Sequence, residues 1–331
     1  MLKKSINFWF LVYPDIRKPV GGVKQIHRVA ENLVSLGCNA VIVQDDANFQ
    51  PDWFQSNLEK ISKDLFFQRE LDPLCDYVVI AETFVPFVEK ICPSIQKIIF
   101  NQNSSYTFGL PAQKLVKPSH LFPLYHHPSI AQIWCVSEFD FNFIAQGLQV
   151  SLEKLFLLPN AIEVDQCIWD PPTHKRISYM TRKCLLDHSV VFELLKSKPW
   201  LQGWKLQPIS KVPHHKVLDI LSNTDIFLTF GHPEGFGLPI AEALACGTAV
   251  VGYSGLGGRE LFHLAEPYQL SYQVEYGDWF GFVEGVHKIH SLYHQCPELM
   301  SQRSRLLSVE IKRKYNPSLL RNCLEHSIQF L

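Results

Sequence analysis

Residues 224–260, TDIFLTFGHPEGFGLPIAEALACGTAVVGYSGLGGRE, decide how this chain folds. They begin with an apolar run, Ile226 to Phe230, whose length and β-branched and aromatic content predict a buried strand. A loop rich in glycine follows, and then a helix that starts near Pro239 and ends at Gly247. A second apolar run, Thr248 to Tyr253, predicts another buried strand. The segment is therefore a βαβ unit whose loop lies at the carboxyl end of a strand, where open α/β sheets bind ligands.

Two carboxylates, Glu234 and Glu242, mark the loop and the helix. Their offset is about two helical turns, so both can lean towards one side of a ligand crevice. Between them the backbone reaches the helix N-terminus, where free N–H groups and the positive end of the helix dipole suit a phosphate. Carboxylates that flank a phosphate cradle suit hydroxyl groups, so the pattern predicts a nucleotide-sugar site. The alternative is an ordinary βαβ turn with a solvated glutamate and a second glutamate on the helix surface.

The segment Glu234 to Glu242, with its Pro-Glu-Gly-Phe-Gly-Leu-Pro core, resembles the E-x7-E motif of retaining GT-B glycosyltransferases of family 4, the glycosyl transferases group 1. The resemblance implies that Glu234 contacts hydroxyls of the donor sugar and that Glu242 binds the ribose. It also implies that backbone amides between them hold sugar and phosphate, namely those of Gly235, Phe236, Gly237 and Leu238. The resemblance is strongest over Arg176 to Glu260 and weaker elsewhere.

Both halves of the chain alternate predicted strands and helices. The first half opens with a strand at Ile6–Tyr13, a Gly-Gly turn, a helix at Val23–Leu36 and a strand at Ala40–Val43. We therefore expect an α/β fold in which two Rossmann-like βαβ domains face each other across a cleft, and the family resemblance implies that this is the GT-B fold. The resemblance further implies an N-terminal acceptor-side domain (1–165), a C-terminal nucleotide-sugar-binding domain (166–315) and a C-terminal helix that packs back on the N-terminal domain (316–331). The proline-containing segment Asp165–Lys175 is the predicted linker.

Further candidate residues follow other predicted strands. Arg182 and Lys183 come after the first strand of the C-terminal domain, where they would neutralise a diphosphate; a solvated basic turn is the alternative. The resemblance places Gly21 and Gly22 beside the donor diphosphate, although a plain tight turn would have the same sequence. Asn103 follows a strand of the N-terminal domain and suits hydroxyl recognition, although turn-forming residues would look similar.

Three positions depart from the family pattern. The family commonly has a lysine about five residues after its arginine, whereas Lys183 directly follows Arg182. Many relatives have a histidine where this chain has Asn101–Asn103, and Ala161 replaces the usual glycine after Asn160. The stretch Gly255–Glu260 follows another strand and is expected to supply further backbone donors; the alternative is that Arg259 and Glu260 form an ion pair at the start of a helix.

The resulting hypothesis is a retaining, metal-independent hexosyltransferase of polysaccharide biosynthesis in which Glu234 and Arg182 are the catalytic residues. The donor is a UDP-, GDP-, dTDP- or ADP-sugar, and the acceptor is a saccharide, a lipid-linked glycan or another hydroxyl compound. No Asp-x-Asp motif is present, and the adjacent pairs His126-His127 and His214-His215 diverge, so we expect no metal and no cofactor. Two alternatives stay open: a nucleotide-sugar 2-epimerase of the same fold and a non-catalytic nucleotide-sugar-binding subunit.

Composition sets the remaining expectations. A net charge of -1 gives no reason to expect a nucleic-acid partner. Nine scattered cysteines suggest free thiols in a reducing compartment. No segment approaches the ~20 apolar residues of a membrane span, so we expect a cytoplasmic protein. The donor base and sugar, the acceptor, the oligomeric state and peripheral contact with a membrane stay open.

Overall fold

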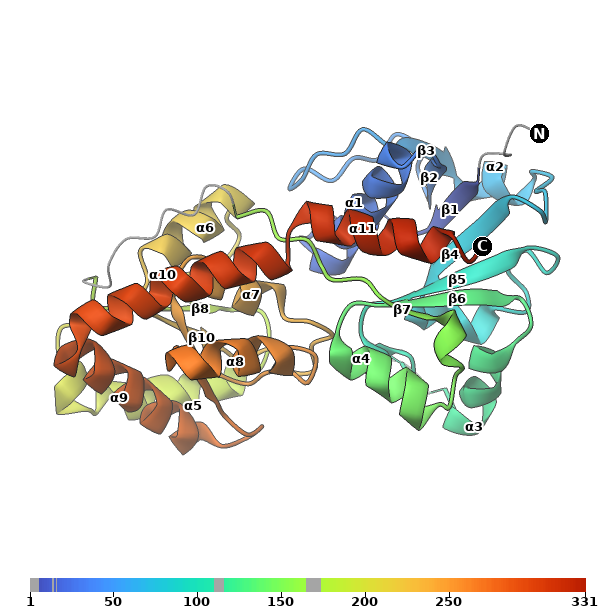
Figure 1. Cartoon of the computed structure of the whole chain (residues 1–331). Helices are drawn as coiled ribbons and strands as arrows, with labels where there is room; N and C mark the ends of the chain where they lie inside the picture. Colours follow the sequence, from blue (N-terminus) through green and yellow to red (C-terminus); the bar gives the residue numbers. More distant parts are fainter. Residues whose placement is uncertain (1–5, 14, 16, 110–115, 165–173) are drawn as a thin grey trace. The chain divides into compact units, whose positions relative to one another are not determined.

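The chain folds into two compact α/β units (Figure 1). The computed structural model describes residues 6–13, 15, 17–109, 116–164 and 174–331. The first unit contains Met1–Ala161 and Pro317–Leu331, and the second contains Ile162–Asn316. Both are built on parallel sheets, so the predicted α/β class with two Rossmann-like βαβ domains is confirmed. The cleft between them stays a prediction, and residues 165–173 of the predicted linker lie outside the described residues.

A sheet of seven parallel strands forms the centre of the first unit. Its order is β3-β2-β1-β4-β5-β6-β7, and the strands are β1 (Asn7–Leu11), β2 (Asn39–Gln44), β3 (Glu59–Ser62), β4 (Asp76–Ala81), β5 (Gln96–Asn101), β6 (Ile130–Cys135) and β7 (Leu155–Leu157). The order reverses between β1 and β4, which makes this pair the topological switch point of the sheet.

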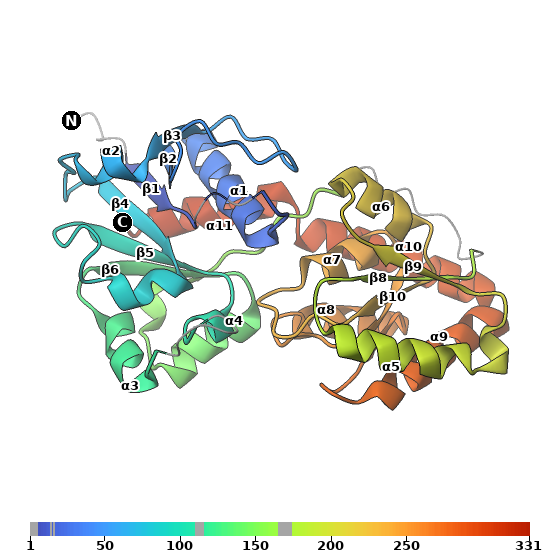
Figure 2. The ribbon, with the colours of Figure 1, turned by 180° about the vertical axis from the view of Figure 1, so that it is seen from behind.

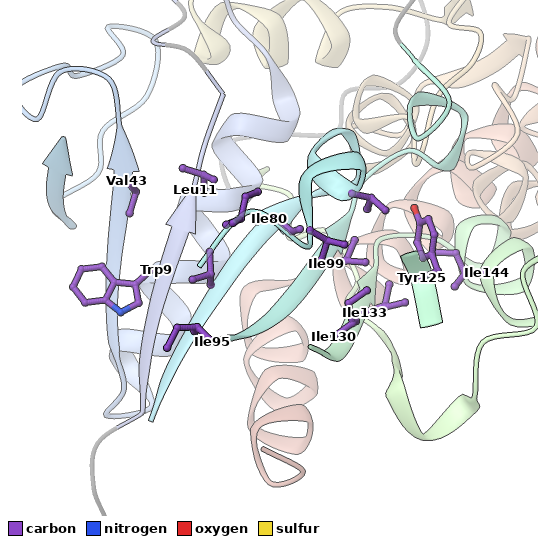
Figure 3. Close-up of a cluster of buried hydrophobic side chains, with 14 of the residues drawn as sticks. Trp9, Leu11, Val43, Ile80, Ile95, Ile99, Tyr125, Ile130, Ile133 and Ile144 are labelled. Atoms are coloured by element: carbon purple, nitrogen blue, oxygen red, sulfur yellow. The ribbon is translucent and has the colours of Figure 1, made fainter. Parts of the chain in front are cut away.

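Both faces of this sheet are buried, which explains why its inner strands are almost continuously apolar. Trp9 and Leu11 point to one face, where they join a hydrophobic cluster with side chains of β2, β4, β5 and β6 (Figure 3). That face is covered by short elements, namely α2 (Lys63–Phe67), α3 (Pro118–Leu121), α4 (Glu138–Asn142) and the turns beside them. On the other face lie α1 (Gly21–Ser35) and α11 (Pro317–Ile328), which pack against each other (Figure 2). The C-terminal helix thus belongs to the first unit.

The second unit has a parallel sheet of five strands in the order β12-β11-β10-β8-β9. The strands are β8 (Arg176–Met180), β9 (Lys205–Ile209), β10 (Ile226–Thr229), β11 (Ala249–Gly252) and β12 (Ser271–Gln273). Helices α5 (Leu185–Lys196) and α9 (Trp279–Gln295) pack together on one face. The other face carries α6 (His214–Ser222), α7 (Leu238–Ala245) and α10 (Pro297–Lys314), and α8 (Arg259–Ala265) packs beside β12. The switch point of this sheet lies between β8 and β10.

The structure corrects several expectations. Gly21 and Gly22 are the first residues of α1, not a turn in front of it. The edge strand β3 was not predicted, because its sequence, EKIS, is short and mostly polar. Of the two interpretations of Gly255–Glu260, the helix start at Arg259 and Glu260 is confirmed by α8. Seven cysteines of the described residues are free, but Cys246 is disulfide-bonded, so the prediction of free thiols was wrong there.

Candidate functional site

The switch point of the second unit carries an ion pair. Lys183 follows β8 and Glu234 follows β10, and these two strands are hydrogen-bonded neighbours. Lys183 Nζ lies 2.9 Å from Glu234 Oε1, and it also donates to the backbone carbonyl of Pro233 at 2.7 Å. Both side chains are about one-quarter exposed, at 22% and 24%. A ligand at the carboxyl ends of these strands would therefore meet a positive and a negative group held side by side.

Glycines hold the backbone of Glu234 in place. The N–H of Glu234 donates to the carbonyl of Gly255 at 2.7 Å, and the N–H of Gly257 donates to the carbonyl of Glu234 at 3.0 Å. A Cβ on Gly231 would lie 2.6 Å from Glu234 Oε1, and one on Gly257 would lie 1.9 Å from the carbonyl oxygen of Gly235. The contact at Gly257 is with backbone, which cannot turn aside, so only glycine fits there. The prediction of free backbone donors was therefore wrong at Gly257, Gly258 and Arg259, whose N–H groups donate to backbone carbonyls, and that of Gly257 fixes the loop that carries Glu234.

The segment between the two predicted glutamates presents a row of backbone N–H groups. Gly237 has φ +88°, a left-handed conformation that suits glycine, and it is the N-cap of α7. Within the part of the chain that the structure describes, no acceptor takes the N–H of the four residues Gly235, Phe236, Gly237 and Leu238. The first three of them are buried. Unpaired N–H groups at a helix N-terminus form an anion-binding arrangement.

The side chain of Phe236 serves the core. It is 3% exposed, and its ring lies 5.0 Å from the ring of Tyr315, just after α10. Tyr315 in turn donates its hydroxyl to Glu260 Oε1 at 2.8 Å. Phe236 can thus offer a ligand its backbone N–H but not its ring. Sequence reasoning did not find Tyr315, because nothing near it in the chain signals this contact.

Glu242 lies in α7 with its side chain 12% exposed. Its Oε1 is 2.8 Å from Nε2 of His214, the first residue of α6. The sequence excluded the pair His214-His215 as a metal site but did not predict this contact. Helices α6 and α7 pack together, and only this packing brings the two residues within reach.

Aromatic side chains adjoin the Lys183–Glu234 pair. The rings of His232 and Tyr276 stack at 4.3 Å with an interplanar angle of 24°. Burial lowers the pKa of His232, and the charge of Lys183 lowers it further while Glu234 raises it. Tyr276 is 62% exposed. Neither residue was predicted from the sequence to belong to the site.

The remaining predicted residues are not gathered at this place. Arg182 is exposed and makes no hydrogen bond or ion pair with the described residues. Gly21, Gly22 and Asn103 belong to the first unit. The carbonyl of Gly22 accepts from Gln102 Nε2 at 2.9 Å, and the side chain of Asn103, 5% exposed, accepts from the N–H of Ser105 at 3.1 Å.

The described residues contain no group of three or more His, Cys, Asp or Glu side chains placed to hold a metal ion. The absence of a metal requirement nevertheless stays a prediction. Among the same residues, no helix combines the length and the apolar character needed to cross a membrane.

The sequence around this site is similar to that of a known protein family. Residues 203–296, which include Glu234, the N–H row and Glu242, match the family described as glycosyl transferases group 1. The chain is similar to this family. The resemblance predicted from the sequence is thereby confirmed, while the retaining, family-4 subtype stays a prediction. No curated protein matches the chain by sequence.

Solved structures resemble the chain over its whole length. A glycosyltransferase from Rickettsia africae has 14% identity and a TM-score of 0.70, with 99% of each chain covered. Sucrose-phosphate synthase from Thermosynechococcus elongatus has 10% identity and a TM-score of 0.73, with 98% of each covered. HepE from Anabaena, in complex with UDP-glucose, has 11% identity and a TM-score of 0.66, with 98% of this chain and all of HepE covered. At these identities the likeness shows the fold, which is that of GT-B glycosyltransferases.

Proposed function

We propose that this protein is a retaining glycosyltransferase that moves a hexose from a nucleotide-sugar to a hydroxyl group of an acceptor. One observation carries the proposal: a row of unpaired N–H groups lies between two carboxylates, Glu234 and Glu242, at the switch point of the second unit. The match of residues 203–296 to the glycosyl transferases group 1 supports it.

Each part of the site suits one part of the donor. The N–H row, with the positive end of the α7 dipole, would bind the diphosphate. Glu234 has one oxygen on Lys183, and its second oxygen would accept hydrogen bonds from hydroxyls of the sugar. Glu242 would accept from the ribose. Lys183, which touches Glu234, would neutralise the diphosphate from the sugar side, and the exposed Arg182 would be a second, outer cation.

The chemistry follows from where charge develops. The bond between the anomeric carbon and the diphosphate oxygen breaks, and negative charge accumulates on the leaving diphosphate. Amide N–H groups and Lys183 that are already oriented stabilise this charge without reorganising. A hydroxyl oxygen of the acceptor forms the new bond on the same face of the sugar, and its proton passes to the leaving phosphate. On this proposal neither a metal nor a covalent enzyme intermediate is needed.

On this proposal the first unit binds the acceptor, and the acceptor is specified by its chemical class alone. We propose a saccharide, a lipid-linked glycan or another hydroxyl compound, which the enzyme meets in the cytoplasm. Gly21, Gly22 and Asn103 stay proposed contacts to the donor from this unit.

Calorimetric titration of UDP, GDP, dTDP and ADP into the wild-type protein and Glu242→Ala tests the proposal, first in buffer and then with EDTA. HepE is described in complex with UDP-glucose, so UDP comes first. We expect one nucleotide to bind best, to bind more weakly to Glu242→Ala, and to be unaffected by EDTA. Binding of none of the four would contradict the proposal. Sugar products formed without any acceptor would indicate an epimerase, and binding without turnover would indicate a non-catalytic subunit.

A further inference from the structure

One contact of the candidate site has no role in the function proposed above. His214 is the first residue of α6, and its Nε2 lies 2.8 Å from Glu242 Oε1 in α7. An ionised carboxylate can only accept hydrogen bonds, so Nε2 carries the hydrogen and donates it. The side chains of His214 and Glu242 are 29% and 12% exposed, which partly shields the contact from water.

The contact restricts how Glu242 can point. A free glutamate side chain samples many rotamers, and fixing it on a ligand costs conformational entropy. The bond from His214 occupies one carboxylate oxygen and holds the plane of the carboxylate. The second oxygen, Oε2, makes no hydrogen bond with any described residue. It is the oxygen through which Glu242 can accept from a ligand hydroxyl.

We propose that His214 is a positioning residue that aligns Glu242 with the ribose hydroxyls, and that the pair thereby selects nucleotides that carry these hydroxyls. The inference rests on the proposed function, since it needs a nucleotide in the second unit. A site built to hydrogen-bond a hydroxyl discriminates strongly against an analogue that lacks it, because a shielded polar group is then left without its partner. A carboxylate held in one orientation cannot turn away to water, so the discrimination depends on His214.

The neighbouring histidine provides a matched control. His215 is exposed and makes no hydrogen bond or ion pair with the described residues. His214→Ala and His215→Ala therefore remove the same side chain from adjacent positions of one helix. His214→Gln is the conservative variant, because its amide N–H can still donate to Glu242.

The experiment measures the dissociation constants of the best-bound nucleoside diphosphate and of its 2′,3′-dideoxy counterpart. In the wild-type protein we expect a preference of about tenfold or more for the form with both hydroxyls. In His214→Ala this preference should fall to roughly twofold, while the affinity for the dideoxy form hardly changes. His214→Gln should recover most of the preference, and His215→Ala should keep all of it. In a Glu242→Ala background, His214→Ala should have no further effect, because His214 acts through Glu242.

The outcomes separate this inference from the proposed function. If no nucleoside diphosphate binds to the wild-type protein, both are overturned. If one binds, and His214→Ala keeps the wild-type preference, only the role of His214 is overturned. An equal loss of affinity for both forms in His214→Ala also overturns it, because the histidine would then support the fold. Thermal unfolding of each variant identifies that case.

Discussion

Each sheet has an acidic side chain at its switch point, which is partly exposed in the second unit and buried in the first. In the second unit, Glu234 follows β10, is about one-quarter exposed and pairs with Lys183 across the switch point. In the first unit, Glu82 follows β4, is 1% exposed and accepts from the N–H of Gln102 at 3.0 Å. The switch point there is bridged by a neutral bond, from Thr83 Oγ1 to Tyr13 Oη at 3.2 Å.

The two switch points also differ in the electrostatics of their carboxylates and in the bonding of the polar groups around them. Burial raises the pKa of Glu82 to about 8, and Asp140 contributes to the rise while the bond from Gln102 opposes it. The polar groups beside it are also used internally, since Gln102 bonds Gly22 and Asn103 caps a turn. In the second unit the polar groups are partly exposed and adjoin unpaired N–H groups. The polar groups at the switch point of the first sheet bond within their own unit, whereas those of the second sheet lie beside N–H groups that no described residue uses.

The largest expected effect is on the second unit. Glu234→Ala should lower turnover about a thousandfold while nucleotide affinity changes little, because the lost contacts are to the transferred sugar. Steady-state rates and calorimetric titration of the same protein separate the two effects. The matched control is Glu193→Ala, which removes an exposed glutamate that pairs with Lys196 at 2.6 Å in the same unit. Wild-type turnover in Glu234→Ala would refute its assignment.

A pH series tests the first unit. The folded state raises the pKa of Glu82 from 4.5 to about 8. Between about pH 4.5 and pH 8 the folded state therefore keeps a proton on Glu82 that the unfolded chain releases. The neutral Glu82 stabilises the folded state at low pH, and this stabilisation is lost as the pH rises from about 4.5 to 8. Between pH 5 and pH 8 the wild type should lose roughly 3 kcal/mol of unfolding free energy relative to Glu82→Gln, which cannot ionise. Urea unfolding measures this, with the exposed Glu89→Gln as control. If the unfolding free energies of wild type and Glu82→Gln change in parallel with pH, folding does not raise the pKa of Glu82.

Two glycine substitutions compare how rigid the backbone is at the switch points of the two sheets. A Cβ on Gly257 would lie 1.9 Å from the carbonyl oxygen of Gly235, so the backbone must move. A Cβ on Gly22 would lie 2.7 Å from the end of the Gln102 side chain, which can rotate away. Gly257→Ala should cost about 2 kcal/mol of stability and should weaken nucleotide binding, whereas Gly22→Ala should cost well under about 1 kcal/mol. Thermal unfolding gives the order, and equal losses would contradict the comparison.

An effect smaller than that of Gly257→Ala is expected at Asn103. Its side chain caps the turn Ser104–Tyr106 by accepting from the N–H of Ser105. Asn103→Ala should lower the unfolding free energy by about 1 kcal/mol, and Asn103→Asp, which can still accept this bond, should lower it less. Chemical denaturation of both variants provides the measurement. An unchanged unfolding free energy in Asn103→Ala would mean that the cap does not stabilise the turn.

The sequence by itself determined the fold class and the core of the candidate site. Apolar runs such as Ile226–Phe230 were enough to locate strands, because the inner strands of a buried parallel sheet are almost continuously apolar. The segment from Glu234 to Glu242 was recognised because its glycines, its proline and its two glutamates lie close together in the chain. Ser137 is a typical N-cap residue, and its hydroxyl accepts from the N–H of Asp140 at 3.2 Å at the start of α4. Local signals of this kind act over a few residues, so a sequence displays them directly.

Only the tertiary structure decided which residues meet. It paired Lys183, and not Arg182, with Glu234, although the two cations are neighbours in the chain. It brought His214 to Glu242, Tyr315 to Phe236 and Gly257 to Gly235, contacts between elements far apart in the sequence. It also buried Glu82 and shifted its pKa, which no property of the local sequence reveals. Side-chain contacts and desolvation depend on how helices pack on a sheet, and that packing is a property of the folded chain as a whole.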